Sequence, residues 1–149
     1  MQRSLSVILW LLAALLAPAV SAQEPPHRAA LVIQFADGTV EERCIAFAEP
    51  QITGEELLKR TGLPLVLDYS FGLGAAVCQI GSDGCDPSKG EECFCQCVGQ
   101  NCRYWAYFEG DGEGGWRYLG IGATSHAVTD GSIEAWHWVS GQSLDASDI

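Results

Sequence analysis

The sequence predicts an α+β roll in which a mixed sheet packs on one short helix and carries a disulfide-rich loop. Three observations predict this class. Two extended segments joined by an Asp-Gly turn begin near residue 29, a capped helix follows within residues 52–62, and aromatic extended segments fill the second half. Strands, then a helix, then more strands is an order typical of one domain whose sheet packs one face on the helix.

The first predicted element is a hairpin. The run "AALVIQF" at residues 29–35 is mostly apolar, "ADGT" supplies the turn, and "VEERCIAF" at residues 40–47 resumes with extended-type residues. An Asp-Gly pair between two such runs is a strong hairpin signal. We therefore expect residues 29–35 and 40–47 to pair as antiparallel strands.

The predicted helix lies in "ITGEELLKRTG". Thr53 can accept a hydrogen bond from the first turn while Glu56, three residues later, reaches back to the cap, which together form a capping box. Gly62 supplies the usual end of a helix. The helix should therefore span two to three turns, with Leu57 and Leu58 facing inward.

The later predicted strands are aromatic. The segment "LPLVLDYSFGLGAAVCQI" is extended and broken by the flexible "FGLG" turn. The runs "YWAYF", "WRYLGI" and "SIEAWHWV" follow, joined by the turn sequences "EGDGEGG" and "TDG". These runs predict the strands that complete the sheet.

The start of the chain has the pattern of a secretory signal peptide. Arg3 precedes an apolar run, and "PAVSA" ends in small residues at Ala22. The apolar run is short for a membrane span, so we expect cleavage after Ala22, secretion or another extracytoplasmic location, and no stable membrane insertion afterwards. The predicted units are a signal peptide at 1–22, a flexible tail at 23–28, one domain at 29–140 and a flexible tail at 141–149.

The chain is strongly acidic. The 149 residues carry a net charge of −11, which becomes −12 when residues 1–22 are removed. Nucleic acids and anionic lipids bind clustered Lys and Arg, so this charge argues against both as partners. An acidic surface keeps a secreted protein soluble, and it also attracts cations or basic partners.

Aromatic side chains alternate along the last strands. Side chains two residues apart share a face of a strand. If the face with Ala106 and Ala135 lies under the helix, an aromatic platform remains on the free face, where a flat conjugated ligand could stack. The expected platform residues are Trp105, Tyr107, Trp136 and Trp138, extended by Trp116. The alternative is that these rings are simply core.

Two histidines are candidate metal ligands. His137 falls on the predicted helix-facing side, which favours a buried, hydrogen-bonded role. His126, in the exposed-looking "ATSHAV", is the better ligand candidate, although the sequence offers it no evident partners. We therefore predict no metal site from the histidines.

The seven cysteines are expected to form disulfides in an exported protein. They are Cys44, Cys78, Cys85, Cys93, Cys95, Cys97 and Cys102. An odd number leaves at least one thiol free, bound to metal or paired with another chain. Cys78 is suitably separated from Cys85 or Cys93 for a local bridge. The alternative is a thiolate site for Cu(I) or zinc in "CFCQC" with Cys102, although the two C-x-x-C pairs of a zinc ribbon are absent.

Motifs for other chemistry are missing. The sequence contains neither G-x-S-x-G nor H-E-x-x-H, and "EGDGEGG" lacks the ligand spacing of an EF-hand loop. We therefore predict a protein that is not an enzyme, has no catalytic residues and requires no cofactor.

An ordered set of motifs resembles a known family. The motifs are "YSFGLGAAVCQIG", "CF", "YWAY", "WRYLGIGA" and "VTDGSIEAWHW". Together, over residues 29–139, they resemble the transcobalamin-like C-terminal domain, a bacterial domain family of unassigned function related to the smaller domain of animal cobalamin carriers. The resemblance implies a β-grasp type fold and a small ligand, with a corrinoid as the precedent. The turn residues Tyr69, Phe71, Gly72 and Gly74 join the expected ligand site.

Three functional hypotheses follow. The first is an exported, non-catalytic module that binds a small ligand, such as a corrinoid, between its aromatic sheet face and the cysteine-rich loop. The second is a protein-interaction module of the cell envelope that contacts a transporter or another surface protein. The third is a thiolate metal carrier that uses the "CFCQC" cluster.

Overall fold

The computed structural model describes residues 26–99, 101–140 and 149. The expected signal peptide at 1–22 and nearly all of the expected C-terminal tail lie outside these residues. Within them, no helix has both the length and the apolar character needed to cross a membrane.

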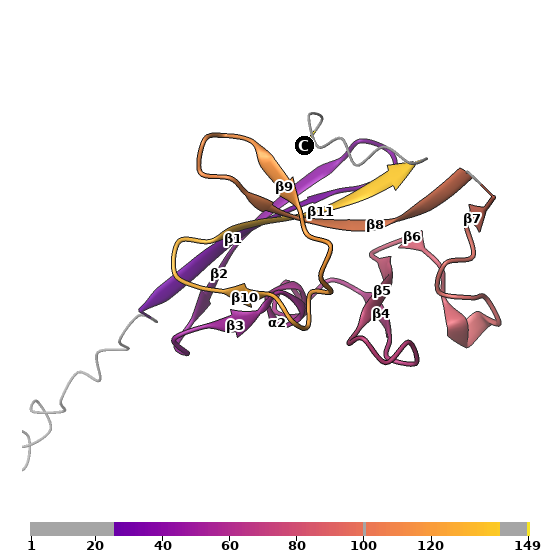
Figure 1. The fold of residues 1–149 in the computed structure, drawn as a ribbon, viewed down its shortest axis with the longest axis horizontal. Coiled ribbons are helices and arrows are strands. Elements are labelled where there is room, and N and C mark those ends of the chain that lie inside the picture. The colour runs from indigo at the N-terminus through magenta and orange to yellow at the C-terminus, as the bar shows by residue number, and fades with distance from the viewer. Residues whose placement is uncertain (1–25, 100, 141–148) are drawn as a thin grey trace, which may run out of the picture.

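A sheet of six strands forms the centre of the fold (Figure 1). Its strand order is β2-β1-β11-β8-β7, with β9 paired to β8. Strands β1 and β11 run parallel, whereas the other pairs are antiparallel, so the sheet is mixed. The bounds are β1 His27–Gln34, β2 Val40–Phe47, β7 Cys97–Val98, β8 Asn101–Gly110, β9 Trp116–Tyr118 and β11 Ile133–Ser140.

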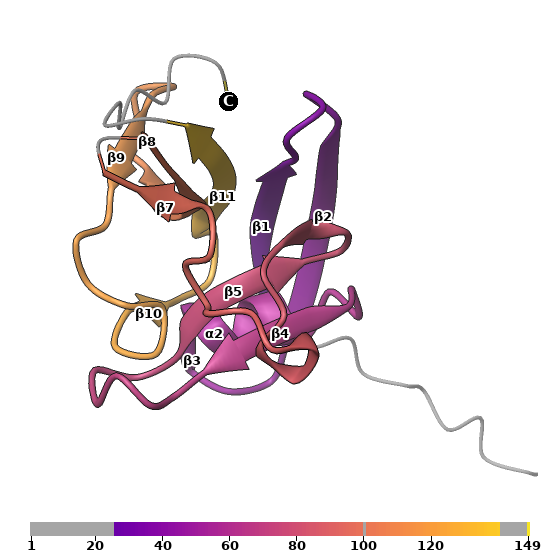
Figure 2. The same ribbon diagram turned by 90° about the vertical axis from the view of Figure 1, so that its right-hand side faces the viewer.

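Smaller elements lie on one side of this sheet, as Figures 1 and 2 show. They are the single short helix α2, Gly54–Lys59, the two-stranded sheet of β3, Ile52–Thr53, with β10, Ala127–Val128, and a three-stranded sheet. The three-stranded sheet contains β4, Leu65–Asp68, β5, Ala76–Ile80, and β6, Asp83–Gly84. A 3-10 turn at Pro87–Lys89 follows. A mostly β domain with mixed sheets and one short helix agrees with the predicted class.

The hairpin and the helix form where predicted, with two corrections, the first of which is that the helix has only six residues and so falls short of the predicted two to three turns. Strands β1 and β2 are antiparallel partners, and the helix has the capping box of Thr53 and Glu56. Strand β1 begins at His27, two residues before the predicted strand. The residues His27 and Arg28 are therefore paired in the sheet, and assigning them to a flexible tail was wrong. The backbone of Arg28 pairs opposite Ala46, and the ring of His27 contacts Phe47, which extends the ladder past the apolar run.

The main core lies between the large sheet and the helix. Leu57 and Leu58 of α2 are fully buried there with Leu31 and Ile33 of β1. Burying a side chain of this size stabilises the folded state by about 1.5–3 kcal/mol relative to leaving it in water. The capping box fixes where the helix starts, and so which of its side chains face the sheet.

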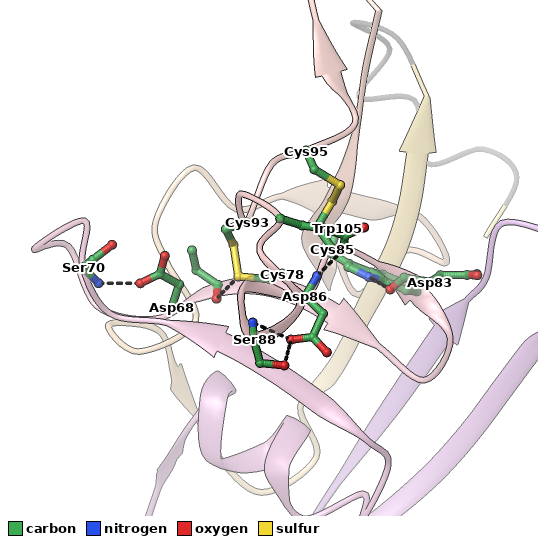
Figure 3. Close-up of a disulfide and its surroundings, with 12 residues drawn as sticks. Asp68, Ser70, Cys78, Asp83, Cys85, Asp86, Ser88, Cys93, Cys95 and Trp105 are labelled. Atoms are coloured by element: carbon green, nitrogen blue, oxygen red, sulfur yellow. Dashed lines mark hydrogen bonds between the residues drawn. A yellow bond between two sulfur atoms is a disulfide. The ribbon is translucent and has the colours of Figure 1, made fainter.

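Three disulfides order the cysteine-rich loop. They join Cys78 to Cys93, Cys85 to Cys95, and Cys97 to Cys102. Figure 3 shows the first two beside Trp105, whose Nε1 donates a hydrogen bond of 3.0 Å to the carbonyl of Asp83. The loop is thereby fastened both to β5 and to β8. Each bridge contributes about 2–4 kcal/mol by restricting the unfolded chain.

The structure confirms that six of the seven candidate cysteines form disulfides, and it identifies the seventh, unpaired cysteine. Cys44 on β2 is exposed and free. The bridged sulfurs of "CFCQC" are not thiolates, so they do not supply the ligands that a thiolate metal carrier needs. Three disulfides are typical of a protein in an oxidising, extracytoplasmic compartment.

This pattern predicts the outcome of thiol alkylation. In the non-reduced, denatured protein, iodoacetamide should modify one cysteine per chain, and after reduction it should modify all seven. Cys44→Ser should remove the modification seen before reduction, because the other six sulfurs are bridged. Intact-mass spectrometry measures both counts. Three or more adducts before reduction would contradict the pairing.

Candidate functional site

The inner face of β8 and β11 carries three cross-strand pairs in a row. The antiparallel register places Trp105 opposite Trp138, Tyr107 opposite Trp136, and Glu109 opposite Glu134. Residues two apart share a face, so these six side chains lie on one side of the sheet. The face therefore changes along its length from aromatic to acidic.

The aromatic part of this face is covered, which corrects the predicted orientation. Its four rings are only 4–8% exposed and belong to the same core cluster as Leu57 and Leu58 of the helix. The face with Ala106 and Ala135 lies on the other side, in a smaller cluster. The large rings offer more apolar area than the alanines, so covering them stabilises the fold more. The expected open aromatic platform was therefore wrong, and the alternative that these rings belong to the core is confirmed.

The acidic part of the face brings two glutamates together. Glu134 is 1% exposed, and the side chain of Glu109 is largely buried. Like charges directly opposite in a sheet are destabilising, so this pair needs positive charge nearby. The imidazole of His126 lies beside both glutamates, with Nε2 3.2 Å from Glu134 Oε1 and 3.6 Å from Glu109 Oε2. Arg117 of β9, opposite Glu109 in register, forms an ion pair with Glu109 Oε1.

The loop before β10 places His126 over the two glutamates. The carbonyl of His126 accepts a hydrogen bond of 3.1 Å from the amide of Gly54 at the start of the helix. The next residue, Ala127, pairs with Thr53 across β10 and β3. The ring of Tyr107 meets the His126 ring edge to face, with centroids 5.6 Å apart. Backbone pairing and ring contact therefore both fix the imidazole.

Glu55 fastens the same loop to the helix. Its carboxylate accepts hydrogen bonds from Thr124 at 2.6 Å, from Lys59 and from the hydroxyl of Tyr69. Burial alone would raise the pKa of Glu55, but these hydrogen bonds together lower it below its ordinary value. The ionised carboxylate of Glu55 therefore holds this loop at Thr124, two residues before His126.

Glu134 is an unusual carboxylate because it is buried without full hydrogen bonding. Burial raises its pKa above the ordinary 4.5, and the opposing effects of Tyr107 and His126 are smaller. The phenol of Tyr107 lies beside Glu134, and its own pKa is raised by burial and by the glutamate charge. Neither Tyr107 Oη nor Glu134 Oε2 has a well-formed hydrogen bond within the described part of the chain. The phenol and the carboxylate therefore act on each other's pKa at the acidic end of the face.

The three side chains have the geometry of an open cation site. One ligand atom from each of Glu109, His126 and Glu134 lies within 4.8 Å of the other two. One imidazole nitrogen and two carboxylate oxygens suit zinc or manganese, and three protein ligands leave coordination positions free. The structure places a second group together, Asp68 with Cys78 and Cys93, but its sulfurs are joined as a disulfide.

An aromatic hollow of about 270 Å³ lies next to this site along the sheet. Three of the predicted ligand residues line it, namely Trp105, Tyr107 and Trp136. Tyr107 and Trp136 stack with centroids 4.5 Å apart and stand between the hollow and the glutamates in the row of cross-strand pairs. The hollow and the cation site therefore share one wall.

The other predicted ligand residues are dispersed. Trp138 packs against Trp105, and Trp116 belongs to the cluster on the opposite face. The residues Tyr69, Phe71, Gly72 and Gly74 occupy the connection between β4 and β5. There Tyr69 contacts Lys59, Phe71 contacts Phe94, and Gly74 lies against Thr124.

The histidines occupy different places from those predicted. His137 alternates with Trp136 and Trp138, so it lies on the face away from the helix, and its predicted orientation was wrong for the same reason as that of the aromatic face. His126 is largely buried rather than exposed. Sequence reasoning missed its partners Glu109 and Glu134, although each lies two residues from an inward-facing aromatic residue in its strand.

Comparison with known proteins shows similarity of fold alone. No protein-family model and no curated protein matches this chain. Among solved structures, the chain is similar to a crystal structure from Ruminococcus gnavus at 1.30 Å resolution, described as that of a "putative metal binding protein". The TM-score is 0.55 with 16% sequence identity, and the match covers 77% of this chain and 98% of the other.

The position of Tyr107 predicts an unusual effect of a glycine substitution. Gly54→Ala should destabilise the protein by about 1–3 kcal/mol, although alanine favours helices, because the added methyl group would meet the Tyr107 phenol. Gly120→Ala is the control, since its methyl group meets no atom within 4 Å. Urea denaturation measures both free energies of unfolding. Equal losses in the two variants would contradict the close packing at Gly54.

The buried carboxylate predicts a specific dependence of stability on pH. In the folded state the pKa of Glu134 is raised, so stability falls as pH rises from the unfolded value of 4.5 through the folded pKa. Glu134→Gln cannot ionise. In chelator, it should therefore be more stable than the native protein at about pH 7.5, with a smaller difference at about pH 4. Urea denaturation at both pH values tests this, and the exposed Glu113→Gln, which should show no such trend, is the control.

Proposed function

We propose that this protein is an extracytoplasmic, non-catalytic small-ligand-binding domain whose ligand is a divalent cation such as zinc or manganese. The observation that carries the proposal is the convergence of Glu109, His126 and Glu134, whose ligand atoms lie within 4.8 Å of one another. A cation would neutralise two glutamates that face each other across the sheet. The description of the fold neighbour as metal binding supports the same class of ligand.

The cation site is assembled from three separate parts of the chain, and each has a distinct role. Glu109 presents Oε2 to His126 while its Oε1 pairs with Arg117. Glu134 supplies a buried oxygen without a formed hydrogen bond. His126 contributes nitrogen, which favours zinc over calcium or magnesium.

Titration of the protein with metal tests the proposal. In a Cys44→Ser background, which removes the free thiol as a competing ligand, zinc should bind with a stoichiometry of one in calorimetry. His126→Ala should weaken binding by at least about tenfold, because a whole ligand is lost. The control His27→Ala, outside the cluster, should leave the affinity unchanged. Tight binding that persists in His126→Ala, or no binding to the native site, would refute the proposal.

The aromatic hollow favours an organic ligand as a second candidate. The family resemblance predicts a β-grasp fold, and the parallel pairing of β1 with β11 next to the β1–β2 hairpin supports it. The same resemblance predicts a corrinoid, and Trp105, Tyr107 and Trp136 line a hollow in which part of a conjugated ligand could pack. Cobinamide added in the presence of chelator should then quench tryptophan fluorescence. Absence of quenching would remove this candidate and leave the cation.

A further inference from the structure

Four exposed side chains, Phe71, Phe94, Tyr118 and Ile121, form an apolar strip on the surface that includes part of the cysteine-rich loop, called the stapled loop below. Phe71 and Phe94 are 51% and 39% exposed, and their ring centroids are 5.6 Å apart. Phe94 also borders the aromatic hollow, whose outer lining includes the exposed Tyr118 and Ile121. Large apolar side chains that gather on a surface in this way mark interaction sites.

Phe94 is held in place by covalent bonds on both sides. Its neighbours Cys93 and Cys95 are bridged to Cys78 of β5 and to Cys85, the residue after β6. The ring of Phe94 belongs to neither core cluster, although both neighbouring residues are disulfide-bonded cysteines. An exposed aromatic side chain on a backbone that is already ordered loses little entropy on binding, which is a property of residues that anchor partners.

The charge around the strip specifies the chemistry of the partner. A second hollow of about 380 Å³ lies beside Phe94 and Phe71, and its charged lining residues are all acidic: Asp68, Glu91 and Glu92. Backbone amides hold two of these carboxylates, with Ser70 N at 2.8 Å from Asp68 and Asp86 N at 2.7 Å from Glu91. The aromatic hollow on the other side of Phe94 has no charged lining residue.

We infer that this strip docks a segment of a partner protein that carries lysine or arginine next to a large apolar side chain. The apolar side chain packs against Phe94 and Phe71, and the basic group meets the carboxylates of the second hollow. A second copy of this chain is excluded as the occupant by charge, since two strongly acidic surfaces repel each other. An anionic membrane is disfavoured for the same reason.

Three fluorescently labelled peptides of equal length test the inference, in chelator so that the cation site plays no part. One alternates lysine with phenylalanine, one replaces its lysines with glutamate, and one replaces its phenylalanines with serine. Fluorescence anisotropy should show binding of the first peptide only, weakened by added salt. Phe94→Ser should weaken it at least about tenfold, as expected for an anchor residue. The double variant Glu91→Gln, Glu92→Gln should reduce both the affinity and its salt dependence.

Val98→Ser is the matched control, because Val98 is a 74% exposed apolar residue of the same loop that lines neither hollow. It should bind the first peptide like the native protein. Alkylation counts verify that each variant keeps its three disulfides. The inference is overturned if the lysine and glutamate peptides bind equally, if none binds, or if Phe94→Ser has no effect. It is also overturned if sedimentation shows that the protein alone dimerises through Phe94.

Discussion

The antiparallel register of β8 and β11 is the constraint on which the rest of the structure depends. It puts two carboxylates opposite each other at one end of a face whose other end is entirely aromatic. Helix α2 covers the aromatic end, and the loop before β10 covers the acidic end with a histidine. A shift of one residue in this register would turn the side chains of one strand to the other side of the sheet, which would separate the two glutamates and remove the site.

The first turn of the helix links the core to the site. Thr53 and Glu56 form the cap, while Gly54 binds the backbone of His126 and Glu55 binds Thr124. Leu57 and Leu58 then pack under the sheet. Six consecutive residues, from Thr53 to Leu58, therefore decide where the helix lies and where the imidazole is held. Stability and site geometry are coupled through this short segment.

The sequence predicted those elements whose signals are local. An Asp-Gly turn, a capping box and alternating aromatic strands each report on neighbouring residues, and the hairpin, helix and strands they predict are present. The cation cluster depends on which strands pair and in what register. Nothing local to Glu109 reveals that it faces Glu134, 25 residues later in the chain. The choice of covered face also depends on packing between distant elements, which explains why the sequence left both an open platform and a core role for the rings as alternatives.

The disulfides join residues that are close in sequence, whereas the central sheet joins strands from opposite ends of the described chain. All six bridged cysteines lie between residues 78 and 102, and their sequence separations are 15, 10 and 5. The parallel pair of β1 and β11 joins the first described strand to the last. As a chain emerges from its N-terminus, the stapled loop can close while β11 is still absent, whereas the sheet must wait for it. Oxidation of the loop and completion of the core are therefore separable events in the folding of this protein.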